Sequence, residues 1–202
     1  MRIVKMDNQK NIQEKNNPKY RTFVVHGIKG QWKIWMLVPL LLAIVFWGTD
    51  YYFHLLALRD MKDKIDIIDI NGVIIQNNEY ACAPASLTML MRDNGINATQ
   101  YDMAKAAYTG ILGTWSRSIA VAGRKYGFDV EVARLNFDQI IDKNLPMIIE
   151  EDEHVVYVVP DLAGRLLHVK DPSMGFALLD KVSFYEYFKP SEKKKCFIFK
   201  KK

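Results

Sequence analysis

The sequence predicts an α+β domain preceded by a single apolar helix. Segments with helical periodicity and helix-ending glycines occupy the first half of the domain, and β-rich runs occupy the second half. Helices that come first, followed by strands joined by short turns, are typical of helices packed on an antiparallel sheet. The chain has 202 residues, half of them apolar and a quarter charged, which suits one such domain with an appendage.

The charge distribution argues against nucleic acid as a partner. The formal net charge is +5, but residues 34–188 carry thirteen basic and twenty acidic residues, a net charge of −7. The positive charge lies in the two tails, so the middle of the chain offers no basic face with interleaved aromatic residues. Two cysteines are too few for a disulfide scaffold or a four-thiolate zinc site, and we expect neither a metal nor another cofactor.

The first quarter of the chain predicts a single-pass membrane anchor. Residues 1–31 are rich in Asn, Lys and Gln, and we expect a disordered, basic, cytoplasmic tail. Residues 34–48 contain no charge, and tryptophans and tyrosines at both ends suit the two interfaces of a bilayer, which sets the predicted span at 32–53. No small-x-small cleavage site follows, which disfavours a signal peptide. A buried core helix is the other alternative.

The basic residues predict the orientation of this anchor. Eight of them precede the charge-free run 34–48, whereas the three within residues 54–69 are mixed with four aspartates. The positive-inside rule therefore places the N-terminus in the cytoplasm and the rest of the chain outside. Residues 54–69 are expected to form a linker or stalk, and residues 70–202 the folded domain.

Glycines and capping residues delimit the helices of this domain. Gly95 and Gly127 each end a helix, and Thr99 caps one. The expected helices cover residues 80–94, 100–108, 116–126 and 137–143. The expected extended segments cover residues 73–76, 129–135, 147–149, 154–159, 166–170 and 196–199.

Cys82 is the candidate nucleophile. It begins the predicted helix over 80–94, because Pro84 suits the first turn, where its missing N–H would be unpaired anyway. The positive end of the helix dipole favours the thiolate form of a cysteine. A lone cysteine is more often a small buried apolar residue, so the assignment depends on a base nearby.

The register of a predicted hairpin selects that base. Two of the four histidines precede the domain, which leaves His154 and His168 on adjacent strands. If the turn is centred between Leu162 and Ala163, His154 faces Asp171 about 5 Å away. His168 then points to the opposite face. We therefore expect His154 as base and Asp171 as its orienting carboxylate, a pairing that a one-residue slip would break. The alternative is that Asp171 only starts a turn.

Four consecutive acidic residues, 150–153, directly precede His154. Such a run is usually a solvated loop, and a guide for basic substrates or a cation site is the alternative. In either case the nearby negative charge raises the proton affinity of the histidine.

In order along the chain, these residues resemble a known family. The pattern Gln76-x5-Cys82-Ala-Pro-Ala-Ser, then His154-Val-Val, then Asp171-Pro-x-x-Gly resembles the bacteriocin-processing, or double-glycine, cysteine peptidases. These are papain-like domains, often fused to peptide-exporting ABC transporters, and the resemblance covers about residues 70–190. It implies a papain-like fold with Cys82 as nucleophile, His154 as general base and Asp171 as orienting carboxylate. Gln76 would be the side-chain donor of the oxyanion hole.

The expected function is a membrane-anchored cysteine endopeptidase acting on an extended peptide or leader sequence. Cleavage after small residues such as Gly-Gly, a bacterial inner membrane and a partnership with secretion or export machinery are what the resemblance implies. Two alternatives stay open. One is a non-catalytic, peptidase-like module that binds a peptide for a secretion or assembly complex. The other is a structural membrane protein in which Cys82 and Cys196 form a disulfide.

Overall fold

The computed structural model describes the backbone of residues 18–188 and 192–201, and the side chains of these ranges from residue 35 onward. The chain divides into two compact units, Met1–Thr49 and Asp50–Lys202.

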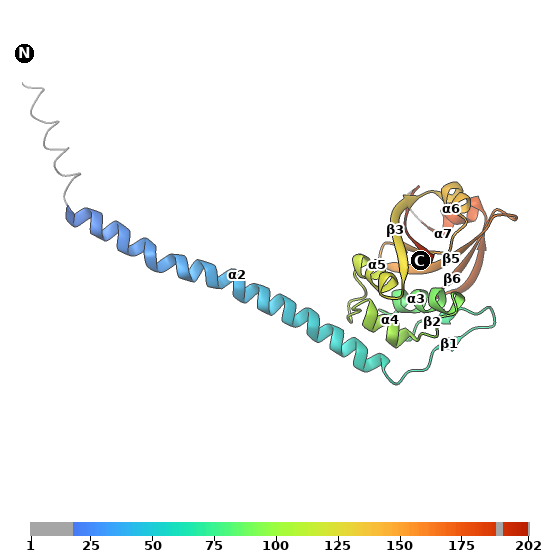
Figure 1. Cartoon of the computed structure of the whole chain (residues 1–202), viewed down its shortest axis with the longest axis horizontal. Coiled ribbons are helices and arrows are strands. Elements are labelled where there is room, and N and C mark those ends of the chain that lie inside the picture. The colour runs from blue at the N-terminus through green and yellow to red at the C-terminus, as the bar shows by residue number, and fades with distance from the viewer. Residues whose placement is uncertain (1–17, 189–191, 202) are drawn as a thin grey trace, which may run out of the picture. The chain divides into compact units, whose positions relative to one another are not determined.

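Helix α2 (Pro18–Met61) contains the predicted membrane span (Figure 1). The side chains of residues 35–49 are exposed, and most of them are large and apolar. Within the described residues, Trp35–Met61 is long and apolar enough to be a candidate span. The expected basic tail lies outside the described residues as far as residue 17. Its remainder is helical, because extending an existing helix costs less than starting one.

The last turns of α2 belong to the folded unit and not to a free linker. His54, Ala57 and Met61 are buried, and their spacing places them on one face of the helix. The His54 ring stacks on Tyr108 with 4.0 Å between ring centroids, and its Nδ1 lies 2.8 Å from a backbone carbonyl oxygen of the same loop. The segment 54–69, expected to form a linker or stalk, is helical as far as Met61 and packed against the folded unit there.

The other elements lie close to their predicted positions. The helices are α3 (Cys82–Asp93), α4 (Gln100–Ala106), α5 (Ser116–Lys125), α6 (Phe137–Lys143) and α7 (Lys181–Tyr187). The strands are β1 (Ile67–Ile68), β2 (Ile74–Ile75), β3 (Phe128–Leu135), β4 (Met147–Glu151), β5 (His154–Asp161), β6 (Leu166–Asp171), β7 (Gly175–Leu179) and β8 (Lys194–Lys201). Thr99 caps α4 in a reciprocal capping box, as its position in the sequence predicts.

Six strands form one antiparallel sheet in the order β3-β8-β4-β5-β6-β7, while β1 and β2 pair separately. Alternate residues of a strand face two different cores. Ile148 and Phe197 belong to the core under α3 and α5, whereas Ile149 and Ile198 belong to the core under α6 and α7. Figure 1 shows these two groups of helices on opposite sides of the sheet. The predicted α+β architecture is confirmed.

The register of the β5–β6 hairpin differs from the predicted one by two residues. Tyr157 pairs with Lys170, so the turn is centred between Ala163 and Gly164. The predicted centre, one residue earlier, is wrong because β5 continues through residue 161. The Asp161 side chain then accepts the Ala163 N–H at 3.1 Å and closes the turn.

The two-residue shift leaves every side chain on its predicted face. A strand has a side-chain period of two, so only an odd shift exchanges the faces. His154 and Asp171 therefore stay on one face as diagonal neighbours and not as directly opposed residues.

We expect Met61→Ala to destabilise the folded unit. Met61 is fully buried, and loss of such a side chain leaves a cavity that typically costs about 2–5 kcal/mol. Met174→Ala is the matched control, since Met174 is 74% exposed. Denaturant unfolding of both variants in detergent measures the difference. If residues 54–61 were only a linker, the two variants would be equally stable.

Candidate active site

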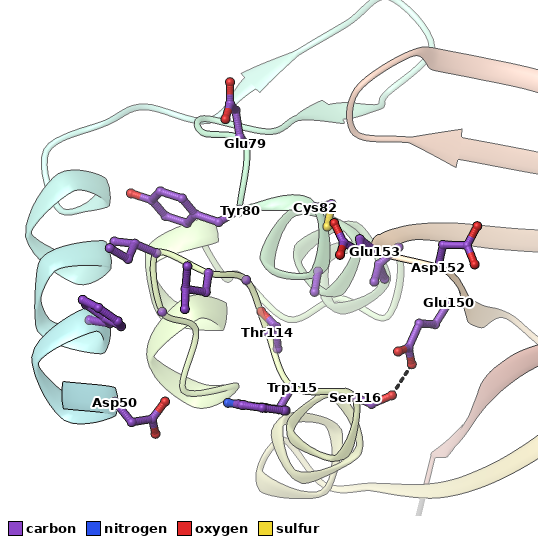
Figure 2. Close-up of a pocket in the computed structure, with 17 residues that line it drawn as sticks. Asp50, Glu79, Tyr80, Cys82, Thr114, Trp115, Ser116, Glu150, Asp152 and Glu153 are labelled. Carbon is purple, nitrogen blue, oxygen red and sulfur yellow. Dashed lines mark hydrogen bonds between the residues drawn. The ribbon is translucent and has the colours of Figure 1, made fainter. Parts of the chain in front are cut away.

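Helix α3 presents Cys82 at its first residue. Pro84 lies in the first turn as predicted, and the N-cap Ala81 makes no side-chain capping bond. No described side chain therefore caps the first N–H groups of this helix, and the thiol lies at the positive end of its dipole. Cys82 is 8% exposed, and its side chain lines a cleft (Figure 2).

A buried hydrogen bond ties this helix to the strand that begins at His154. The Ser86 hydroxyl, one helical turn after Cys82, donates to the Val155 carbonyl oxygen at 3.0 Å. Ser86 and Val155 are both buried, so water does not compete for the bond. The start of α3 and the start of β5 are thereby held together.

The side chains of His154 and Asp171 form a close pair. His154 Nε2 lies 2.9 Å from Asp171 Oδ1, which leaves Nδ1 as the ring nitrogen available to Cys82. Hydrogen bonds with Asp171 and with Cys82 raise the pKa of His154 to about 9, although burial opposes the change. The imidazole is therefore protonated at neutral pH.

Asp171 is a buried carboxylate with hydrogen bonds to both oxygens. Its Oδ1 accepts the Ser173 N–H and hydroxyl, each at 2.7 Å, and the Met174 N–H at 3.2 Å, in addition to the His154 contact. Its Oδ2 accepts a hydrogen bond from the Tyr187 hydroxyl. Burial alone would raise the pKa of Asp171, but these hydrogen bonds hold it well below its usual range. Asp171 thus starts the turn and also contacts the histidine.

Gln76 lies beside the loop that follows β6. Its backbone N–H donates to the Pro172 carbonyl oxygen at 2.9 Å, while its side-chain Oε1 is buried without a partner among the described residues. The buried Gln100 holds the flanking backbone, with Nε2 donating to Ile75 O at 2.9 Å and Oε1 accepting the Asn77 N–H at 3.2 Å. The segment around Gln76 is therefore fixed on both sides.

Four supporting residues were not predicted. Ser173 follows Asp171 in an Asp-Pro-Ser turn, whose local hydrogen bonds sequence patterns do signal. Gln100 was predicted only as the first residue of a helix. Ser86 and Tyr187 act through contacts far along the chain, which a single sequence does not reveal.

The remaining cysteine and histidine lie elsewhere. Cys196 belongs to the core on the opposite face of the sheet from Cys82, and both cysteines are free, which contradicts the disulfide alternative. Burial raises the pKa of the Cys196 thiol to about 12, so it stays protonated. The His168 ring packs edge-on against Phe176 with 5.7 Å between centroids, on the face of the sheet away from His154, as predicted.

The cleft beside Cys82 has a volume of about 760 Å³. Besides Cys82 it is lined by Asp50, Phe53, Glu79, Tyr80, Ala83, Gly110, Ile111, Leu112, Gly113, Thr114, Trp115, Ser116, Glu150, Asp152, Glu153 and Val155. Figure 2 shows the end of α2 forming one wall and the β4–β5 turn the opposite wall. No group of three or more His, Cys, Asp or Glu in the described part of the chain is placed to hold a metal ion.

Comparison with known proteins decides the family. The model of the Peptidase C39 family matches residues 70–191, more than half of the chain. The chain belongs to the Peptidase C39 family. The predicted resemblance is thereby confirmed.

This C39 protein is also similar to two other proteins in sequence and to solved structures in fold. Two uncharacterized proteins, from Methanothermobacter thermautotrophicus (strain Delta H) and Methanothermobacter marburgensis (strain Marburg), are each 22% identical over 116 residues, 57% of this chain and 82% of theirs. The peptidase domain of Streptococcus ComA, a bi-functional ABC transporter, has a TM-score of 0.55 at 20% identity, over 64% of this chain and 98% of that domain. A double glycine motif protease from an AMS/PCAT transporter, solved with the leader peptide, has a TM-score of 0.55 at 20% identity, over 69% of this chain and all of that one. The papain-like fold is confirmed.

We expect the His154 ring to titrate at a pKa of about 9 and Asp171→Asn to lower that pKa. The folded pKa exceeds the ordinary value of 6.5, so protonated His154 stabilises the fold fully below about pH 6.5. This contribution is lost as the pH rises through about 9. NMR titration of the ring measures the pKa directly. Asp129→Asn, an exposed carboxylate on β3, is the control, and an unshifted titration in Asp171→Asn would contradict the pairing.

Proposed function

We propose that this C39 protein is a cysteine endopeptidase in which Cys82 is the nucleophile. His154 is the acid and base, Asp171 orients it, and Gln76 with the Cys82 N–H stabilises the oxyanion. The observation that carries the proposal is the hydrogen-bonded His154–Asp171 pair beside a thiol at an uncapped helix N-terminus. Membership of the Peptidase C39 family supports it.

In the proposed mechanism the Cys82 thiolate attacks the scissile carbonyl carbon. The negative charge that develops on the carbonyl oxygen is stabilised by the Gln76 side-chain amide and the Cys82 N–H. Protonated His154 gives its proton to the leaving amine, which departs and leaves a thioester on Cys82. Neutral His154 then takes a proton from the water that hydrolyses the thioester, while Asp171 fixes the ring throughout.

The proposed substrate is an extended peptide or leader sequence cut after small residues such as Gly-Gly. The support is the family, together with the double glycine motif protease solved with a leader peptide. Secretion or export machinery is the proposed partner, because that protease and ComA both belong to transporters.

We also propose that the predicted span, residues 32–53, anchors the chain in a membrane, as a bacterial inner-membrane protein with the N-terminus in the cytoplasm. The last residues of this span, among them Asp50 and Phe53, then lie outside the bilayer, where they line the cleft. The exposed apolar run from Trp35 to Trp47 supports the anchor, since water disfavours an apolar surface of this length. The eight basic residues before the run support the orientation. The peptidase domain then acts outside the cytoplasm.

We expect Cys82→Ala and His154→Ala to abolish cleavage of a Gly-Gly peptide by the full chain, and His168→Ala to keep most of it. Gln76→Ala lowers kcat about 10²–10³-fold with little change in KM, the usual loss for one oxyanion donor. Asp171→Asn costs less than loss of the base, since the orienting carboxylate is the least demanding member of such a set.

The control for these variants is peptide binding. Variants that bind the peptide but do not cut it support the mechanism. If wild-type protein binds the peptide and never cuts it, the protein is the non-catalytic peptide-binding module. An inactive His168→Ala with an active His154→Ala would contradict the assignment of the base.

The proposed topology predicts that a reporter fused after residue 202 lies outside the cytoplasm. The charge difference across the anchor is the physical reason. A phosphatase that is active only outside and a fluorescent protein that matures only inside give opposite signals, and fusion to the N-terminus is the control. Cytoplasmic signals from both ends would contradict the topology.

A further inference from the structure

The charged residues that line the cleft beside Cys82 are all acidic. Five carboxylate residues line it, and no Lys or Arg does. Figure 2 shows Glu153 next to Cys82, Glu150 and Asp152 beyond it with Asp152 pointing away from the thiol, Glu79 on another side, and Asp50 on α2. These residues come from three separate parts of the chain, so the negative lining is a property of the folded cleft and not of the acidic run 150–153 alone.

Most of these carboxylates have no cationic partner among the described residues. Glu150 has a cationic partner, with Lys195 Nζ 3.1 Å from its Oε2. Asp50, Glu79, Asp152 and Glu153 make no ion pair with any described residue. By contrast, Glu151, within the same acidic run but outside the cleft, pairs with the buried Lys194 at 2.8 Å. Within the acidic run, Glu150, Asp152 and Glu153 line the cleft, and of these only Glu150 has a cationic partner among the described residues.

The apolar part of the lining suits the stem of a long basic side chain. Phe53, Tyr80 and Trp115 contribute aromatic rings, and Leu112 is 85% exposed beside them. Aromatic faces attract ammonium and guanidinium groups, and apolar walls cover the methylene stem. A groove with one sign of charge and low-dielectric walls also concentrates ions of the opposite sign.

We propose that this cleft selects peptides with Lys or Arg close to the scissile bond, with Asp152 and Glu153 as the main specificity residues. The inference rests on the proposed function, because it assigns the cleft beside Cys82 to the peptide. A peptide bound in extended form advances about 3.3 Å per residue, so a basic side chain within a few residues of the cut reaches the carboxylates. Acidic peptides are repelled by the same groups.

The test compares peptides that share one Gly-Gly cut site and carry Lys, Gln or Glu at the positions on either side of Gly-Gly. We expect kcat/KM to be at least about fivefold higher for Lys than for Gln, and lower again for Glu, mainly through KM. The preference falls as salt is added, since the partners are solvent-exposed. The readout is the ratio of kcat/KM between peptides, so a change in rate that is common to all peptides does not affect it.

A double variant and a matched control locate the effect. Asp152→Asn with Glu153→Gln removes two charges from the cleft, and we expect the Lys-to-Gln ratio to fall to near one. Asp142→Asn with Glu186→Gln removes two exposed charges on α6 and α7, outside the cleft, and we expect it to keep the ratio. The inference is overturned if wild type cuts the three peptides equally, or if the control lowers the ratio as much as the cleft variant.

Failure of the proposed function gives a different result. If wild type cuts none of the peptides, the proposed peptidase activity fails, and the inference is tested by binding alone. Fluorescence anisotropy with labelled peptides and Cys82→Ala should then show tighter binding of the Lys peptide. Equal binding of the Lys and Gln peptides would overturn the inference whether or not the protein is a peptidase.

Discussion

The packing of α3 against the start of β5 is the constraint on which the site depends. The Ser86–Val155 hydrogen bond fixes it at a place that excludes water, and Tyr157 continues the contact in the core under α3. Cys82 and His154 each stand at the first residue of their own element. The distance between the two residues is therefore set by the packing of α3 on the sheet.

The candidate site also requires that the buried Asp171 carboxylate stay ionised. Transfer of an ionised carboxylate from water costs several kcal/mol unless its oxygens find donors. Asp171 finds them in its own turn, in His154 and in Tyr187 of α7, on the far side of the sheet from α3. The helices on both faces of the sheet thus support the site, one supplying the thiol and the other holding the carboxylate.

The sequence was informative where structure is local. Thr99 and Pro84 indicated where two helices begin. The alternation of side chains along a strand correctly predicted that His154 and Asp171 share one face, even though the turn centre was predicted one residue too early. The face is insensitive to the two-residue register error, because only a shift by an odd number of residues moves a side chain to the other face. The turn centre was missed although its signal is local, because the Asp161 side chain accepts the N–H two residues on, as aspartates in turns commonly do.

Contacts between residues that are far apart in the chain could not be predicted from the sequence. His54 packs against Tyr108, and the α2 residues that line the cleft, Asp50 and Phe53, lie just before it in the chain. Nothing local to this part of the sequence shows which surface will receive it. Tyr187 and Gln100 are similar cases. Each has a polar group that bonds to a residue far along the chain, and a single sequence does not show which residue that is.

The position of β8 has a consequence for biosynthesis. This strand, the last of the sheet to be synthesised, lies between β3 and β4 and not at an edge. Until it leaves the ribosome the sheet stays in two parts, and Glu151, at the turn that leads to His154, lacks its buried partner Lys194. The helix α2 emerges much earlier. The domain therefore completes its fold only after α2 has left the ribosome. A chain truncated before β8 contains every proposed catalytic residue but lacks the strand that joins β3 to β4.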